Sequence, residues 1–181
     1  MKAIFLDRDG VINKYPGDRR YVTSWKYFRF LPRVKKAISL LTQKNYKLFI
    51  ISNQAGVGKK VFSKKALEEI TQNMLRQIRQ AGGDIEGVYY CTHRKEVLCS
   101  CRKPKAGLID LVTKRYPFNR KKVFFIGDTI RDVYTAKAAG CKSILVLSGK
   151  EKMRNQKLWE IQPDFVCRDL FLAAKLILSK K

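Results

Sequence analysis

Short, almost continuously apolar runs recur along the chain and are separated by longer stretches with helical periodicity. Runs of this kind are typical of strands that are buried on both faces of a sheet. The sequence predicts five such strands and a short edge strand before the last helix. They cover residues 3–6, 47–52, 87–90, 122–127 and 143–147, and the edge strand covers residues 164–167.

Apolar residues at a spacing of three and four predict helices between these strands. One helix covers residues 32–45, where Val34 begins the apolar face. A longer helix follows Ser63, which is a suitable N-cap residue, and ends at Gly82 and Gly83. Further helices are predicted at about 107–116, from about 130 to Gly140, and around Leu170, Ala173, Ala174 and Ile177.

Strands that alternate with helices and are apolar throughout predict an α/β fold. The expected architecture is a three-layer sandwich, with helices on both faces of a mostly parallel, Rossmann-like sheet. We find no internal repeat, low-complexity segment or linker, so residues 1–181 are expected to form a single domain. In such a sheet, ligands bind at the carboxyl ends of the strands.

Composition changes this picture only through the charge. The chain is 45% hydrophobic, which excludes a disordered protein, and no apolar stretch approaches the length of a membrane span. The N-terminus becomes polar too soon for a signal peptide, so we expect a cytoplasmic protein without a membrane partner. The net charge of +24 is spread along the chain and indicates either an anionic partner or a lysine-rich solvated surface. Basic and aromatic residues do not alternate, which favours the second interpretation.

Polar residues follow the predicted strands at the points where the strands end. Asp7 and Asp9 come directly after the first strand, where a buried carboxylate without a partner would be unfavourable. Because the carboxyl ends of parallel strands meet at one edge of a sheet, we expect the members of this set to lie close together. Carboxylates suit Mg²⁺, whereas hydroxyl, lysine and backbone amide groups suit phosphate oxygens. The other members are Ser52, Asn53, Gln54 and Ala55 after the second strand, Arg102 and Lys103 after the third, and Asp128, Thr129 and Asp132 after the fourth.

Three of the five cysteines lie within eleven residues, together with the only histidine. Four ligands of this type at short spacings fit a closed, tetrahedral zinc site. The alternative is a group of incidental thiols in a lysine-rich loop, because this spacing is less diagnostic than paired CxxC motifs. The members are Cys91, His93, Cys99 and Cys101, whereas Cys141 and Cys167 are expected to be small buried hydrophobic residues.

Four segments, "DRDGVIN", "ISNQAGVG", "CRKPKAG" and "IGDTIRD", occur in this order. They resemble the four motifs of the haloacid dehalogenase (HAD) superfamily of phosphatases, from residue 3 to about residue 148. The chain is most similar to the HAD-IIIA branch of histidinol-phosphate and heptose-bisphosphate phosphatases. The resemblance implies a Mg²⁺-dependent phosphomonoesterase that forms an aspartyl-phosphate, with heptose 1,7-bisphosphate as the expected substrate. Histidinol phosphate, nucleic-acid 3′-phosphates and a non-enzymatic, zinc-stabilised basic binding module are the alternatives.

The resemblance also assigns roles to the strand-end residues. Asp7 is the expected nucleophile and stays ionised, and Asp9 keeps a proton for the leaving alcohol and then activates water. Asp7, Asp128 and the backbone carbonyl of Asp9 are expected to bind Mg²⁺. Ser52 and Lys103 are expected to hold the phosphoryl oxygens. Asp132 either orients the metal ligands or simply favours the start of a helix.

Too few residues follow the first two motifs for a cap domain, so the resemblance implies a capless enzyme. A structural Zn²⁺ in the loop 91–101 is expected to aim Arg102 and Lys103 at the phosphate. Specificity then falls to this loop and to the segment "KYPGDRRYV", whose arginines either bind a second phosphate or face solvent. We expect a monomer that acts on a small phosphorylated sugar, with nucleic acid as a less favoured partner. The expected substrate-binding residues are Arg8, Arg19, Arg20, Asn53, Gln54, Ala55 and Arg102.

Overall fold

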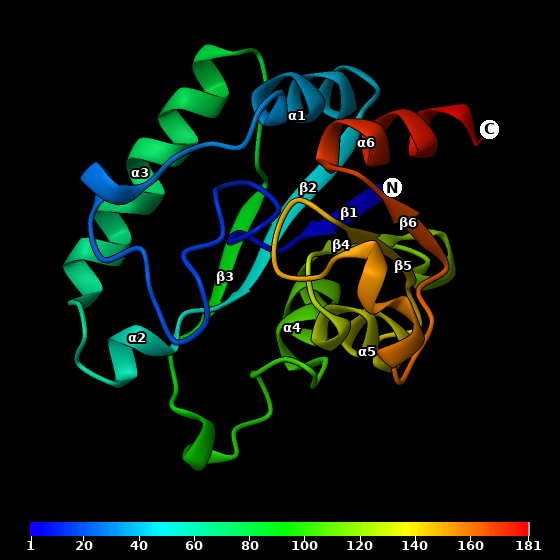
Figure 1. The fold of residues 1–181 in the computed structure, drawn as a ribbon. Helices are drawn as coiled ribbons and strands as arrows, with labels where there is room; N and C mark the ends of the chain where they lie inside the picture. Colours follow the sequence, from blue (N-terminus) through cyan, green and yellow to red (C-terminus); the bar gives the residue numbers. More distant parts are fainter. Residues whose placement is uncertain (181) are drawn as a thin grey trace.

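A computed structural model of the protein describes residues 1–180 (Figure 1). Its centre is a six-stranded sheet with the strand order β3-β2-β1-β4-β5-β6, in which all neighbouring strands are parallel. The α/β prediction is therefore confirmed. The strands are β1 (Lys2–Leu6), β2 (Tyr46–Asn53), β3 (Gly87–Cys91), β4 (Phe124–Gly127), β5 (Lys142–Val146) and β6 (Phe165–Cys167).

Helices cover both faces of the sheet and make the three layers that the sequence predicts. Helices α1 (Val34–Gln43), α3 (Lys64–Gln80) and α6 (Leu170–Ser179) lie on one face (Figure 1). Helices α4 (Gly107–Arg115) and α5 (Ile130–Ala138) lie on the other. The shorter elements are α2 (Ala55–Gly58) and the 3-10 turns Trp25–Tyr27, Lys95–Val97, Arg120–Lys122 and Met153–Leu158.

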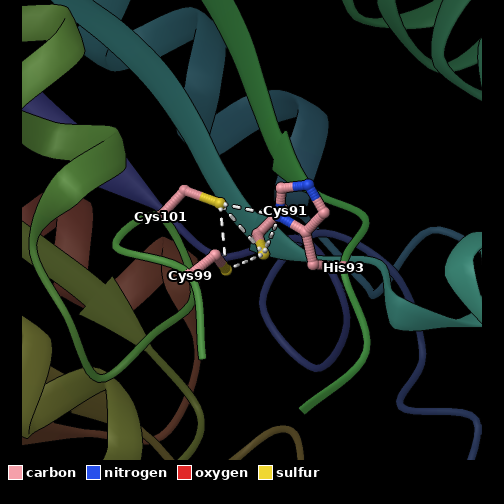
Figure 2. A group of neighbouring side chains, drawn as sticks. All are labelled: Cys91, His93, Cys99 and Cys101. Atoms are coloured by element: carbon pink, nitrogen blue, oxygen red, sulfur yellow. Dashed lines mark hydrogen bonds between the residues drawn. The ribbon is translucent and has the colours of Figure 1, made fainter. Parts of the chain in front are cut away.

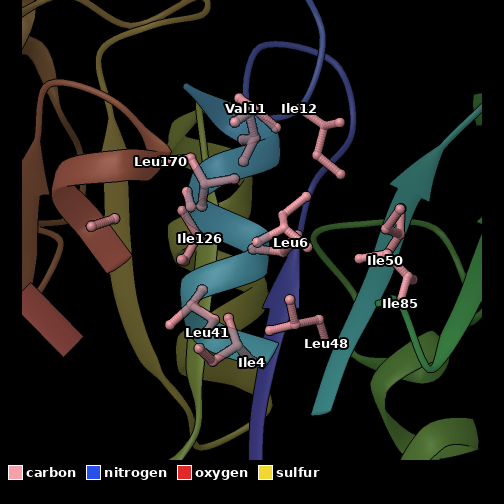
Figure 3. Close-up of a cluster of buried hydrophobic side chains, with 14 of the residues drawn as sticks. Ile4, Leu6, Val11, Ile12, Leu41, Leu48, Ile50, Ile85, Ile126 and Leu170 are labelled. Atoms are coloured by element: carbon pink, nitrogen blue, oxygen red, sulfur yellow. The ribbon is translucent and has the colours of Figure 1, made fainter. Parts of the chain in front are cut away.

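The alternation of side chains along β1 divides the core between the two faces. Ile4 and Leu6 pack toward α1 and α6, where Figure 3 shows Leu41 and Leu170 facing them. Phe5 points to the opposite face and joins the cluster under α4 and α5. Residues of β1 are thus buried on both sides, which explains its continuously apolar sequence.

Most differences from the predicted bounds have local causes. The first helix begins at Val34 rather than residue 32, because Arg33 has a left-handed backbone with φ of 62°. Strand β4 begins at Phe124, because Arg120–Lys122 forms a 3-10 turn. Ser63 is the predicted N-cap, and its hydroxyl accepts a hydrogen bond from the backbone of Ala66 at 3.0 Å. No helix within residues 1–180 is long and apolar enough to cross a bilayer.

Candidate active site

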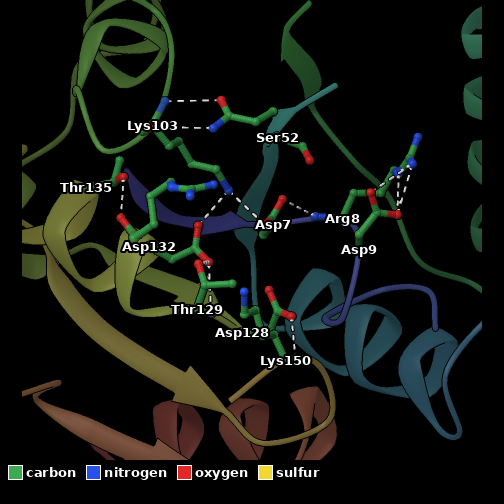
Figure 4. Close-up of polar contacts among 12 residues, drawn as sticks. Asp7, Arg8, Asp9, Ser52, Lys103, Asp128, Thr129, Asp132, Thr135 and Lys150 are labelled. Atoms are coloured by element: carbon green, nitrogen blue, oxygen red, sulfur yellow. Dashed lines mark hydrogen bonds and ion pairs between the residues drawn. The ribbon is translucent and has the colours of Figure 1, made fainter. Parts of the chain in front are cut away.

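Asp7 takes the first position after β1, at the carboxyl edge of the sheet (Figure 4). Its backbone N–H donates to the carbonyl of Ile126 in β4 at 2.9 Å, which fixes the residue between the two central strands. One carboxylate oxygen lies 2.8 Å from Nζ of Lys103. Burial raises the pKa of Asp7, and the charge of Lys103 offsets only part of this rise. The Asp7 carboxylate therefore lies at the edge of the sheet in an ion pair with one buried cation, Lys103.

Asp128 follows β4 and is only 2% exposed. Its Oδ2 accepts a hydrogen bond from the backbone of Lys150 at 2.8 Å (Figure 4). Two glycines leave room for this carboxylate, since a Cβ at Gly10 or Gly149 would lie 2.1 or 2.0 Å from Oδ2. Burial, with the negative charges of Asp132 and Asp7, raises the pKa of Asp128 well above its ordinary value. The hydrogen bond from Lys150 and the charge of Lys103 offset only part of this rise.

The chemistry of these donors fits a hard divalent cation. Asp7, Asp128 and Asp132 each provide a carboxylate oxygen, and the three oxygens lie within 4.8 Å of one another. Lys103 is buried between two of them, 2.8 Å from Asp7 and 2.6 Å from Asp132. Three carboxylates around one lysine leave excess negative charge, which Mg²⁺ with its oxygen ligands would neutralise. Asp9 was predicted to bind the metal through its backbone carbonyl, and its carboxylate is not part of this group within the described residues.

Asp9 is held away from the metal group by three side chains. Arg8 donates to both of its carboxylate oxygens, at 2.9 and 3.1 Å (Figure 4). Asn13 donates to Oδ1 at 2.8 Å and Gln54 to Oδ2 at 3.0 Å. Burial alone would raise the pKa of Asp9, but the Arg8 charge and these hydrogen bonds outweigh burial and lower it. The pKa of Asp9 is thus lowered and that of Asp7 is raised, whereas the sequence-based expectation assigns the retained proton to Asp9.

Two predicted phosphate-site residues, Ser52 and Lys103, are positioned by the last residue of β2 and the residue that follows it. Asn53 accepts a hydrogen bond from the backbone N–H of Lys103 at 3.1 Å and donates to its carbonyl at 3.2 Å. Gln54 donates to Oγ of Ser52 at 3.3 Å as well as to Asp9. Asn53 and Gln54 therefore position other site residues, and Asn53 also lines the cleft. Their contact with substrate stays a prediction. Ala55 lines the cleft as the first residue of α2.

These residues form the floor of a cleft of about 450 Å³. Its rim carries cations from several segments, and Arg19, Arg20 and Arg102 are among them, as the sequence predicted. Lys150 reaches across the rim, and its Nζ lies 2.7 Å from Asp18. The sequence interpretation missed three of the rim cations, which are Lys59, Arg131 and Lys150.

Four side chains of the loop after β3 converge in a second cluster (Figure 2). Sγ of Cys101 lies 3.3 Å from Sγ of both Cys91 and Cys99, and 3.3 Å from Nδ1 of His93. A tetrahedral zinc site with Zn–S bonds of about 2.3 Å places its sulfurs about 3.8 Å apart, so the four donors are already near that geometry. None of the cysteines within residues 1–180 forms a disulfide.

The thiols of this cluster already differ in acidity. Burial alone would raise the pKa of Cys99, but hydrogen bonds from Cys101 and Cys91 outweigh it and lower the pKa to about 6. Burial and its two cysteine neighbours raise the pKa of Cys101 to about 12. Arg102 donates to the carbonyl of His93 at 3.2 Å, which ties the cluster to the cleft. The residues therefore fit a closed structural Zn²⁺ site.

Known proteins share both the sequence and the fold. A family model described as HAD-hydrolase-like matches residues 100–173. D-glycero-beta-D-manno-heptose-1,7-bisphosphate 7-phosphatase of Neisseria meningitidis is 40% identical over 152 residues, which cover 84% of this chain and 80% of that protein. The chain belongs to the HAD superfamily, in its heptose-bisphosphate phosphatase family. The resemblance seen in the motifs is thereby confirmed.

Other HAD phosphatases of this family match the chain along its whole length. The enzyme of the same name from Bordetella bronchiseptica is 32% identical over 180 residues and covers 99% of both chains. A crystal structure of the B. bronchiseptica D,D-heptose 1,7-bisphosphate phosphatase, complexed with magnesium and phosphate, superposes with a TM-score of 0.92 over all of both chains at 33% identity. The Burkholderia thailandensis phosphatase gives a TM-score of 0.76 at 27% identity, covering 99% of this chain and all of the other.

One predicted HAD substrate contact needs correction. The Arg8 side chain is fully buried, at 0% exposure, and does not line the cleft. Its guanidinium forms an ion pair with Asp9 and cannot contact a substrate in this arrangement. The sequence places Arg8 in a strand-end motif but does not show whether its side chain points into the cleft or into the core. A substrate contact was therefore predicted.

A simple signal would have found two of the missed rim cations. Lys150 comes shortly after β5, and the rule that singled out Asp128 after β4 applies equally to that strand end. The same rule applies to Arg131, which follows β4 and lies within the motif "IGDTIRD". Lys59 carries no such signal. Lys59 ends the short α2, which the sequence did not predict, and Arg131 lies in the first turn of α5.

Proposed function

We propose that this chain is a Mg²⁺-dependent phosphatase that removes the 7-phosphate of D-glycero-D-manno-heptose 1,7-bisphosphate. The observation that carries the proposal is the buried group of Asp7, Asp128, Asp132 and Lys103 at the carboxyl edge of the sheet. The family relationship and the names of the relatives support the substrate. We further expect a monomer that acts in the cytoplasm.

In the first half of the reaction, Asp7 attacks the phosphorus atom. The bond from phosphorus to the sugar oxygen breaks, and the oxygen keeps the electron pair of this bond. Asp9 then donates a proton to the oxygen. Because Arg8 lowers the pKa of Asp9 in the free enzyme, Asp9 must gain this proton when the substrate binds. The products of this half are the sugar alcohol and an aspartyl-phosphate on Asp7.

In the second half, water attacks the phosphorus of the aspartyl-phosphate. Asp9 accepts a proton from this water, and the bond between phosphorus and the Asp7 oxygen breaks to release inorganic phosphate. The low pKa of Asp9 keeps it ionised, as a base requires. Ser52 and Lys103 hold the phosphoryl oxygens through both halves, since they lie beside Asp7 at the floor of the cleft.

Two separate groups of residues would each hold a metal ion. Asp7, Asp128 and the backbone carbonyl of Asp9 would hold Mg²⁺, with Asp132 close to the same group. When bound, Mg²⁺ supplies positive charge that neutralises the phosphoryl oxygens. Cys91, His93, Cys99 and Cys101 would hold a structural Zn²⁺ that fixes the loop carrying Arg102 and Lys103.

Phosphate release from four substrates tests the proposal. The substrates are the two anomers of heptose 1,7-bisphosphate, histidinol phosphate and a 3′-phosphorylated oligonucleotide, each with Mg²⁺. We expect a clear preference for one heptose anomer and no turnover by Asp7→Asn, which should keep its fold. A preference for the oligonucleotide would make the cationic rim the better guide to the substrate. Full activity of Asp7→Asn would refute the aspartyl-phosphate mechanism.

A further inference from the structure

Arg8 is a buried cation whose only ion pair in the described residues is with Asp9. Its Nε and Nη2 both donate to Asp9 Oδ1, at 3.2 and 2.9 Å (Figure 4). The remaining nitrogen, Nη1, is buried and has no hydrogen-bond partner within residues 1–180. The orientation of the guanidinium, and with it that of the Asp9 carboxylate, therefore depends on the residue that packs against the guanidinium.

Tyr90 provides that packing surface. It lies in β3, and the Arg8 guanidinium carbon is 5.9 Å from the centre of its ring. This distance allows a cation–π interaction, which is strengthened when water is excluded. Burial would lower the pKa of Arg8, but the charge of Asp9 and the nearby Tyr90 oxygen outweigh it. Tyr90 therefore presents its ring to the guanidinium, and its oxygen is near enough to influence the Arg8 charge.

A hydrogen-bond chain fixes the orientation of the Tyr90 hydroxyl. Oγ1 of Thr71 lies 3.0 Å from the Tyr90 oxygen and 2.7 Å from the carbonyl of Leu67. A carbonyl only accepts, so the single Thr71 proton goes to Leu67, and Tyr90 must donate to Thr71. The lone pairs of the Tyr90 oxygen are then left for the Arg8 guanidinium. The chain ends on the backbone of α3, which is a rigid support.

We propose that Tyr90 is a positioning residue that acts through Arg8 to hold Asp9 in line for proton transfer. The inference rests on the proposed function, in which Asp9 protonates the leaving alcohol. Tyr90 contacts neither the cleft nor the metal group, so its effect must pass through Arg8. Proton donation matters for an alkyl leaving group and little for 4-nitrophenolate, which leaves without a proton. A misplaced Asp9 should therefore harm the two kinds of substrate unequally.

The experiment compares Tyr90→Phe with the wild type on heptose 1,7-bisphosphate and on 4-nitrophenyl phosphate. Tyr90→Phe keeps the ring and removes only the hydroxyl. The quantity compared is kcat/KM, which covers only the steps up to release of the alcohol and so leaves out the second half, which both substrates share. We expect kcat/KM on the sugar phosphate to fall about tenfold and kcat/KM on the aryl phosphate to change less than about twofold. Thr71→Val, which removes the acceptor for Tyr90, should give the same selective loss. Tyr89→Phe is the matched control, since Tyr89 points to the other face of the same strand and should change neither rate.

Asp9→Asn separates failure of this inference from failure of the proposed function. If Asp9→Asn loses the sugar phosphate selectively but Tyr90→Phe and Thr71→Val do not, the positioning role is wrong. Equal losses on both substrates in Tyr90→Phe would mean a general structural role and would also overturn it. If Asp9→Asn itself shows no selective loss, or the wild type hydrolyses neither substrate, the proposed function fails first.

Discussion

Lys103 and Asp132 form a buried ion pair, with 2.6 Å between Nζ and Oδ1 and only 3% of either side chain exposed. The second carboxylate oxygen of Asp132 accepts hydrogen bonds from the backbone and the hydroxyl of Thr129, at 3.1 and 2.6 Å. These bonds cap the first turn of α5. One carboxylate therefore starts a helix and holds the lysine that faces Asp7, so Asp132 does more than favour a helix dipole.

Asp132→Asn should affect both stability and turnover. The amide keeps part of the cap but leaves Lys103 with one carboxylate instead of two, so we expect unfolding to become about 2 kcal/mol more favourable. Loss of the orienting charge should lower kcat by about 10- to 100-fold. Thermal unfolding and phosphate release measure the two effects. Asp110→Asn removes an exposed ion pair with Arg120 and serves as the control. Equal kcat values for the two variants would rule out a role of Asp132 in the site.

The sequence predicted the order of the elements because strands buried on both faces are apolar throughout and are easily recognised. All six strands were found, and Ser63 was correctly assigned as an N-cap. The short α2 was missed because four residues are too few to show helical periodicity. Arg33 was placed within a helix because its left-handed backbone has no signal in an arginine.

The sequence predicted which residues gather at the strand ends but not which way they point. A parallel sheet fixes the neighbourhood of Asp7, Lys103 and Asp128, whatever the details of the loops. The direction of Arg8 depends instead on Tyr90, which is 82 positions away in the sequence and has no motif to connect it. The lowered pKa of Asp9 also could not be predicted, because it depends on the buried ion pair between Arg8 and Asp9.

Removal of one cysteine tests the zinc cluster. The protein should purify with about one Zn²⁺ per chain, and Cys99→Ser should lose it and unfold at a lower temperature. Activity should fall as well, because the loop that carries Arg102 loses its anchor. Cys167→Ser lies outside the cluster and should keep the metal. Metal analysis and thermal unfolding are the measurements, and a metal-free wild type of full stability would exclude the zinc site.

Alanine substitutions at Gly10 and Gly140 distinguish the effect of backbone strain from a steric effect on the metal group. Both have positive φ, of 82° and 70°. An added Cβ meets nothing within 4 Å at Gly140 but lies 2.1 Å from Asp128 Oδ2 at Gly10. Gly140→Ala should therefore cost about 1 kcal/mol of stability and keep full activity. Gly10→Ala should also raise the Mg²⁺ concentration for half-maximal activity by about tenfold or more. An unchanged Mg²⁺ requirement would show that Asp128 is not a ligand.

Asp164 gives the fold a stability that depends on pH. Its Oδ2 accepts from the backbone and hydroxyl of Ser143, both at 2.7 Å, and Lys137 Nζ lies 2.7 Å from Oδ1. Burial alone would raise its pKa, but these partners lower it to about 2 from the ordinary 3.8. The folded state binds this proton more weakly than the unfolded state, so the stabilisation is complete above about pH 4 and is lost as the pH falls to about 2.

Asp164→Asn keeps an oxygen for Ser143 and removes only the charge. The variant should be less stable than the wild type by about 1 kcal/mol at pH 7, a modest value because water screens this partly exposed group. Urea unfolding at several pH values should show the difference shrinking between about pH 4 and pH 2. Asp84→Asn, which breaks an exposed contact of 3.6 Å with Arg79, should show little difference at any pH. If the Asp164→Asn difference stays constant down to pH 2, its origin is packing and not the ionised carboxylate.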